Sequence, residues 1–162
     1  DHKERKYVFN PFQLVMNRGH YYLVGNHENY DDMSTLRVDR IAHVTVLNER
    51  RKPLREIKGY QQQRTFNVSQ YVKEHIYMFG GESITVTFKA RRSIVNQILD
   101  WFDGNVEFTN ITADNVVCRV RVNHDAFKYW ALQYMQSVKV LSPASLVAEV
   151  KEAIEEGLHQ YS

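Results

Sequence analysis

The second half of the chain changes its hydrophobic period repeatedly, and these changes limit the folds that it can adopt. Residues 83–90 alternate apolar and polar side chains, which is typical of a half-buried strand. Residues 92–104 carry apolar side chains at helical spacing. Both patterns recur downstream, so the sequence predicts the order βαββαβ and a last helix that ends near His159. This order indicates a ferredoxin-like α+β unit over residues 83–162.

The apolar faces of the three predicted helices define a candidate core. The first face holds Val95, Ile98, Leu99 and Phe102, the second Phe127, Trp130, Ala131 and Tyr134, and the third Leu146, Val150, Ile154 and Leu158. Ser142 and Pro143 predict the N-cap and first position of the third helix. Cys118 alternates with valines, so we expect a buried side chain and no reactive thiol. His124 and Asp125 are interpreted as the start of the second helix.

Residues 1–64 follow a different pattern, with short extended runs, turns and no helical period. Residues 17–20 predict a turn, and residues 35–49 predict one long strand. Such a segment is typical of a small β-barrel. Residues 65–82 predict a linker with one short helix, capped by Asn67 or Ser69.

Composition and motifs exclude several classes of protein. No apolar run is long enough to span a membrane, and a single cysteine fits a reducing compartment, so we expect a cytoplasmic protein. Phosphate-binding glycine loops, zinc spacings and nucleophile–base motifs are absent from the sequence. We therefore expect no cofactor, no metal ion and no enzymatic activity. Residues 1–64 contain 12 Lys and Arg against 8 Asp and Glu, which favours an anionic partner.

The stretch YYLVGNHENYDDMSTLRVDRI, residues 21–41, combines aromatic and basic side chains. Guanidinium groups bind phosphate oxygens through two parallel hydrogen bonds, and tyrosine rings can stack on bases. The candidate ligand-binding residues are Tyr21, Tyr22, Arg37, Arg40, His20 and His27.

Strand alternation constrains how these side chains can meet. Tyr22 shares its face with Val24, so we expect Tyr22 on the core side and Tyr21 in solvent. Arg37 and Arg40 are three positions apart, so a regular strand would place them on opposite faces. They can converge with Tyr21 on one patch only if the strand breaks near Asp39. The alternative is that Asp39 pairs with one arginine in a purely structural contact.

The same stretch resembles the WYL domain, the effector module of many bacterial transcription regulators. Tyr21-Tyr22-Leu23 corresponds to the motif that names the family, and Arg37-Val38-Asp39-Arg40-Ile41 to its arginine strand. Many members carry a further arginine where this chain has Ser34. Residues 66–82 and 138–161 resemble the C-terminal extension that accompanies this module.

The resemblance implies a fold and a role. It implies an Sm/SH3-like barrel whose first strand is incomplete at Asp1. It also implies a nucleic-acid or nucleotide ligand, such as a single-stranded oligonucleotide, on the basic face, and duplex DNA bound by a helix-turn-helix upstream of Asp1. We expect a homodimer in which the extension takes part. The alternative function is a structural dimerisation module that has no ligand of its own.

Overall fold

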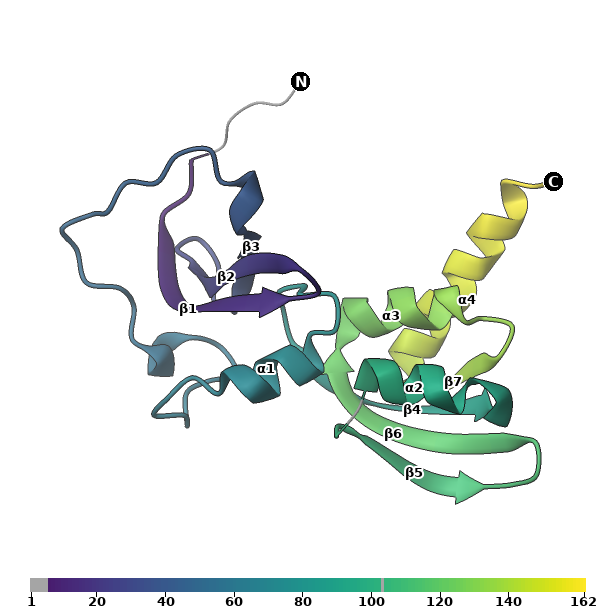
Figure 1. Ribbon diagram of the computed structural model, residues 1–162. Helices are drawn as coiled ribbons and strands as arrows, with labels where there is room; N and C mark the ends of the chain where they lie inside the picture. The colour runs from purple at the N-terminus through teal and green to yellow at the C-terminus, as the bar shows by residue number, and fades with distance from the viewer. Residues whose placement is uncertain (1–5, 103) are drawn as a thin grey trace. The chain divides into compact units, whose positions relative to one another are not determined.

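The computed structural model describes residues 6–102 and 104–162 and has a mixed α+β architecture (Figure 1). The chain divides into two compact units. The first unit comprises the residues up to Val72 together with Met78–Glu82. The second comprises Lys73–Tyr77 and Ser83–Ser162. Among the described residues, no helix is both long and apolar enough to cross a membrane.

The first unit contains a three-stranded antiparallel sheet in the order β1-β2-β3. Its strands are β1 (Phe9–Asn17), β2 (His20–His27) and β3 (Ser34–Arg37). The predicted turn at residues 17–20 joins β1 to β2, and Arg18 and Gly19 both adopt positive φ there, 48° and 79°. Glycine adopts this conformation without steric cost, which explains the tight connection.

The described residues of this unit form no closed barrel, and the predicted long strand over residues 35–49 stops early. It ends at Arg37, a single 3-10 turn follows as η1 (Val38–Arg40), and residues 41–53 then run without strand pairing. Val44 and Val46 are 78% and 91% exposed. Alternation favours an extended chain, but a strand also needs a neighbour for its backbone hydrogen bonds, and residues 41–49 pair with no strand that the structure describes.

The core of the first unit packs beneath one face of its sheet. Two short elements close it, η2 (Leu54–Glu56) and α1 (Val68–Glu74). Asn67 caps α1, because its Oδ1 accepts a hydrogen bond of 3.0 Å from the backbone N–H of Gln70. The buried apolar side chains are Val15, Val24, Met33, Leu54, Ile57, Tyr71 and Met78.

The second unit follows the predicted element order. The first elements are β4 (Ser83–Arg91), η3 (Arg92–Ile94), α2 (Val95–Phe102) and β5 (Val106–Ile111). They are followed by β6 (Asn115–Asn123), α3 (His124–Gln133), β7 (Val138–Ser142) and α4 (Ala144–His159). The strands form one antiparallel sheet in the order β5-β6-β4-β7.

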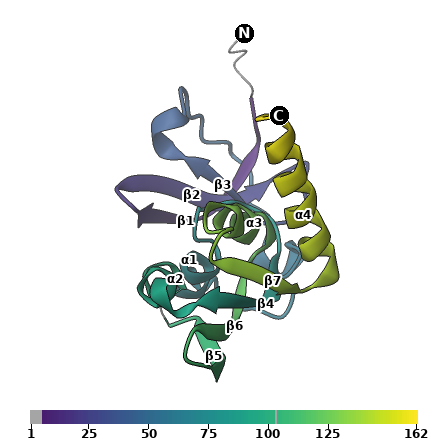
Figure 2. The same cartoon turned by 90° about the vertical axis from the view of Figure 1, so that its right-hand side faces the viewer.

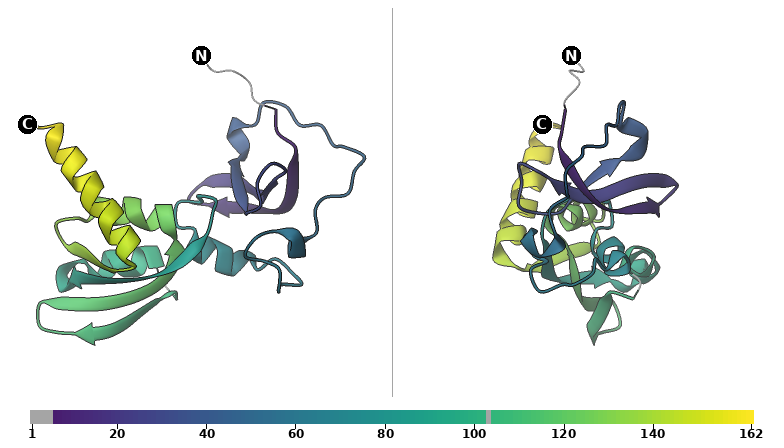
Figure 3. Two further views of the ribbon diagram at one scale, coloured as in Figure 1. Left: turned by 180° about the vertical axis from the view of Figure 1, so that it is seen from behind. Right: turned by 90° about the vertical axis from the view of Figure 1, so that its left-hand side faces the viewer.

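Helices cover one face of this sheet and leave the other open (Figures 1 and 3). Phe88, Phe102, Phe127 and Trp130 form the centre of the covered side, where their ring centroids lie 4.8–6.3 Å apart. Cys118 is fully buried in the same core, and burial raises the pKa of its thiol to about 11, as expected for an unreactive cysteine.

The last helix differs from the sequence prediction at its start. Ser142 belongs to β7, and Pro143 occupies the N-cap position without a side-chain hydrogen bond. The predicted apolar stripe leaves the core gradually along the helix: Leu146 is fully buried, Ile154 is 39% exposed and Leu158 is 69% exposed. Figure 2 shows the C-terminal half of α4 extending beyond the sheet.

Candidate functional site

Tyr22 and Arg37 lie side by side, near the start of β2 and at the end of β3. In the β2–β3 register Tyr22 lies opposite Arg37, and Val24 lies opposite Thr35. Directly opposed residues share a face, so Arg37 lies on the same face as Tyr22. Tyr22 packs against the core of the first unit, as predicted.

Tyr21 lies on the other face and is 55% exposed. The predicted convergence of Tyr21 with Arg37 is therefore not seen. Side-chain alternation correctly places the two tyrosines on opposite faces of the strand. Which tyrosine lies beside Arg37 depends on the register between β2 and β3, and alternation within one strand does not determine that register. Leu14 and Met16, opposite Leu23 and Tyr21 in β1, are exposed beside Tyr21.

Asp39 neutralises Arg37 within the same turn. The guanidinium donates two hydrogen bonds, from Nε to Oδ1 at 2.9 Å and from Nη2 to Oδ2 at 2.7 Å. These hydrogen bonds hold the pKa of Asp39 at about 2, and His20 adds a smaller Coulomb contribution in the same direction. They also raise the pKa of Arg37. The structural ion pair considered as an alternative is thus present.

The pair coincides with the predicted break in the strand. β3 ends at Arg37, and Val38–Arg40 forms the 3-10 turn η1, which carries Asp39 back toward the guanidinium. Arg40 closes the turn, is exposed and forms no ion pair with any residue that the structure describes. The structure therefore groups Tyr22, Arg37 and Arg40 with His20 at one end of the sheet, and we call these four residues the arginine turn.

His27 lies at the opposite end of β2, roughly 20 Å along the strand from His20. Its side chain is 9% exposed and lies between the rings of Tyr7 and Tyr30, with centroid distances of 4.8 Å and 4.9 Å. Nδ1 accepts a hydrogen bond of 3.2 Å from the N–H of Asn29, and Nε2 has no hydrogen-bond partner in the described structure. His27 therefore supports the loop after β2 and lies outside the arginine turn.

The basic run after residue 49 is fixed along the first sheet. Arg51 donates to the carbonyl of Pro11 at 3.1 Å, and its guanidinium lies 4.4 Å from the ring centroid of Phe12. The backbone N–H of Lys52 donates to Oδ1 of Asn10 at 2.8 Å. These contacts have structural roles, and the sequence offered no signal for them because the partners lie 40 and 42 positions apart.

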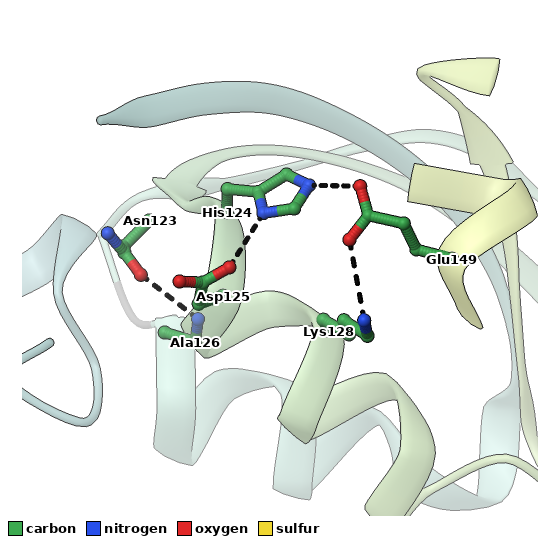
Figure 4. A network of polar contacts seen from close by, with 6 residues as sticks. All are labelled: Asn123, His124, Asp125, Ala126, Lys128 and Glu149. Carbon is green, nitrogen blue, oxygen red and sulfur yellow. Dashed lines mark hydrogen bonds and ion pairs between the residues drawn. The ribbon is translucent and has the colours of Figure 1, made fainter. Parts of the chain in front are cut away.

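A second polar network lies in the second unit (Figure 4). Asn123 caps α3 by accepting from the N–H of Ala126 at 3.0 Å. His124 contacts Asp125 at 2.9 Å and Glu149 at 3.1 Å, and Glu149 also accepts from Lys128 at 3.4 Å. The network joins α3 to α4, which agrees with the interpretation of His124 and Asp125 as a helix start. In residues 6–102 and 104–162, no three or more His, Cys, Asp or Glu side chains are placed so that they could hold a metal ion.

Comparisons with known proteins find similar solved structures. A search of curated protein sequences gives no significant match. Among solved structures the chain is similar to proteasome accessory factor B/C (PafBC) of Arthrobacter aurescens, with 18% identity over 96% of this chain and 22% of that one and a TM-score of 0.46. It is also similar to a CRISPR Cas-related protein, with 15% identity over 99% of this chain and 44% of that one and a TM-score of 0.55. The chain spans less than half of either protein, and the second likeness concerns the fold alone.

Two family matches cover most of the chain. Residues 1–46 match the WYL domain, and residues 81–158 match the WCX domain. The first range contains the tyrosine and arginine motifs of the arginine turn, and the second contains the four-stranded sheet. The chain thus contains a WYL domain followed by a WCX domain.

Proposed function

We propose that this chain is the ligand-sensing region of a bacterial transcription regulator, and that the arginine turn binds a nucleic-acid or nucleotide ligand. The observation that carries the proposal is the register that sets Tyr22 beside Arg37 at the point where the strand gives way to a turn. A half-buried tyrosine beside one guanidinium group, with a second arginine in the turn that follows, offers both ring contact and phosphate hydrogen bonds. The WYL match supports the regulatory context.

Binding at this site would begin with an exchange of partners. Asp39 occupies two of the five N–H donors of Arg37, and the remaining donors, with those of Arg40, are available to phosphate oxygens. A phosphate that displaced Asp39 would gain the paired geometry that the carboxylate now uses. The ligand thus competes with a carboxylate of the same turn.

The test is a fluorescence anisotropy titration of the chain with a labelled oligo(dT) at low salt. Replacing Arg37→Ala together with Arg40→Ala should weaken binding by about ten- to a hundredfold, because each charge-assisted hydrogen bond contributes ~1.5–3 kcal/mol. The matched control is Arg55→Ala with Arg64→Ala, which removes the same charge from exposed positions of the first unit. Equal effects of both pairs, or no effect of the first, would remove the basis of the proposal.

We also propose the finer architecture that the family resemblance implies. Residues 83–162 form a ferredoxin-like unit, which the order β5-β6-β4-β7 and the βαββαβ sequence of elements support. Residues 1–64 belong to an Sm-like barrel, of which the three described strands are one part. In such a regulator a helix-turn-helix outside residues 1–162 would bind duplex DNA.

Assembly is a second candidate function, and the last helix favours it. The apolar stripe of α4 leaves Leu158 69% exposed, and Tyr161 just beyond the helix is 92% exposed, although soluble monomers rarely leave a large apolar patch uncovered. A homodimer joined through α4 would cover it. Sedimentation across a range of concentrations should show a dimer for the native chain and a monomer for Leu158→Asp, whereas an unchanged mass would exclude this helix from the contact.

A further inference from the structure

The open face of the sheet in the second unit is strongly basic. Alternation along β4, β6 and β7 turns apolar residues toward the helices and polar residues away from them. The outward positions carry five exposed cations, Lys89, Arg91, Arg119, Arg121 and Lys139. We call this surface the basic sheet face.

The register brings two of these cations directly together. Lys89 on β4 lies opposite Lys139 on β7. Like charges that oppose each other across neighbouring strands destabilise a sheet, so this arrangement has a cost for the free protein. On the other side of β4, Thr85 lies opposite Arg121 and Thr87 lies opposite Arg119, which places hydroxyl groups between the charges.

Few carboxylates neutralise this face. Glu107, opposite Arg119, is the only acidic residue at an outward position of the four described strands, and no ion pair joins the two there. Arg121 pairs with Glu74 at 3.3 Å. The other four cations form no ion pair with any residue in the described part of the chain. The unit therefore presents unpaired positive charge on a broad, nearly uncovered surface.

Several acidic residues of the same unit lie away from this face. Glu152, Glu155 and Glu156 are exposed on α4, in the helical layer on the opposite side of the sheet. The second unit is thus divided into a basic sheet side and an acidic helix side, although the charges nearly cancel when counted along the sequence. A local charge separation of this kind attracts polyanions in spite of a small net charge.

We propose that the basic sheet face binds the phosphodiester backbone of a nucleic acid. The five cations are distributed over three strands, and the face spans about 20 Å along β4, which suits a polymer with repeated charges better than a single small anion. None of its outward residues is aromatic, so bases gain no stacking platform. Binding should therefore be insensitive to sequence and strongly dependent on salt.

This inference rests on the proposed function only in the choice of a nucleic acid over other polyanions. The face lies in the WCX domain, far along the chain from the arginine turn, and the two sites use different residues. The proposals can therefore fail separately. If only the arginine turn binds the nucleic acid, charge reversal on the basic sheet face leaves the affinity unchanged. If only the basic sheet face binds it, Arg37→Ala with Arg40→Ala leaves the affinity unchanged.

The experiment compares two single substitutions in the full chain. Lys139→Glu and Lys151→Glu change the net charge equally, but Lys139 lies on the basic sheet face and Lys151 is exposed on α4 beside Glu155. The probes are a labelled oligo(dT) of about 16 nucleotides and a mixed-sequence duplex of equal length. Each titration is repeated at several salt concentrations and in the Arg37→Ala, Arg40→Ala background.

Lys139→Glu should weaken binding of at least one probe by about tenfold, and Lys89→Glu with Lys139→Glu should do so further. For the oligo(dT), the slope of log K against log salt should fall in magnitude by about 0.7 for each phosphate that the protein no longer neutralises. Lys151→Glu should change the affinity much less. Equal effects of the two single substitutions, or no binding of either probe to the native chain, would overturn the proposal. Capture of a peptide copying residues 144–162 in place of both probes would instead assign the face to an acidic helix of a second copy.

Discussion

The two sheets of this protein treat positive charge in opposite ways. In the first sheet Arg37, one of the two arginines of the family motif, is already paired, because Asp39 lies two residues away and folds back onto it. In the second sheet Lys89 and Lys139 oppose each other without any described carboxylate nearby. In a short motif, an acidic residue can pair with a nearby cation of the same motif. Cations that come from separate strands to one surface are neutralised only if an acidic residue also lies on that surface.

The largest expected effect concerns the independence of the two units. Phe88→Ala should destabilise the second unit by about 3–5 kcal/mol, since this ring is fully buried among three other aromatic rings. Ile57→Ala should cost the first unit about 2–5 kcal/mol. In urea titrations followed by amide NMR signals, each variant should lower the midpoint of its own unit. A common midpoint for all signals in both variants would mean that the units unfold together.

A smaller effect should follow from removing the carboxylate of the first sheet. Asp39→Asn keeps the shape of the side chain but frees the donors of Arg37, so oligo(dT) affinity should rise by up to about fivefold. Glu56→Gln is the control, because Glu56 is an exposed carboxylate of the same unit outside the arginine turn. If Asp39→Asn bound more weakly than the control, Asp39 would hold Arg37 in its binding position and would not compete with the ligand.

Removing one of the two opposed lysines in the second sheet should raise the stability of the second unit slightly. Lys139→Thr removes one of the two opposed ammonium groups and suits a strand, so the unfolding free energy should rise by ~0.2–1 kcal/mol. Thermal unfolding at low and high salt measures this change, which salt should diminish. Lys151→Thr, in a helix, should give no such gain, and a lower melting temperature for Lys139→Thr would show that the repulsion is negligible.

The smallest effect is expected from pH. The pKa of Asp39 is lowered in the folded state to about 2, so the Arg37 ion pair contributes fully above about pH 4 and is lost only as the pH falls toward 2. Between about pH 5 and 8 this pair should therefore be unchanged. Carboxyl carbon shifts followed by NMR should give a midpoint near 2 for Asp39 and a midpoint near its ordinary value in Arg37→Ala. A native midpoint near the ordinary value would mean that the pair does not persist in solution.

The sequence predicted the second unit well because its signals are local. Periodicity located α2, α3 and α4, and it identified Phe127, Trp130 and Leu146 as core residues. It was wrong about residues 35–49, because alternation cannot say whether a neighbouring strand exists to pair with. Ser142 failed as a helix cap since the strand continued through it.

The candidate sites show the same limit. Because residues alternate between the two faces of a strand, Arg37 and Arg40 could converge only if the strand broke near Asp39, and β3 does end in a turn there. The pairing of Arg37 with Tyr22 in place of Tyr21 depends on the register, which no local pattern contains. The basic sheet face depends in addition on the order of strands, because Lys89 and Lys139 are far apart in the sequence and adjacent in the sheet.

The carboxylate that Arg37 already holds has a consequence for which ligands can act as signals. A ligand with one negative charge replaces one anion by another and gains little, so abundant monoanions in the cell would leave the turn unchanged. At the proposed site, a ligand with several phosphates would displace Asp39 with one group and bind Arg40 with the next. Competition from Asp39 would then disfavour singly charged metabolites and favour ligands that carry several linked phosphates.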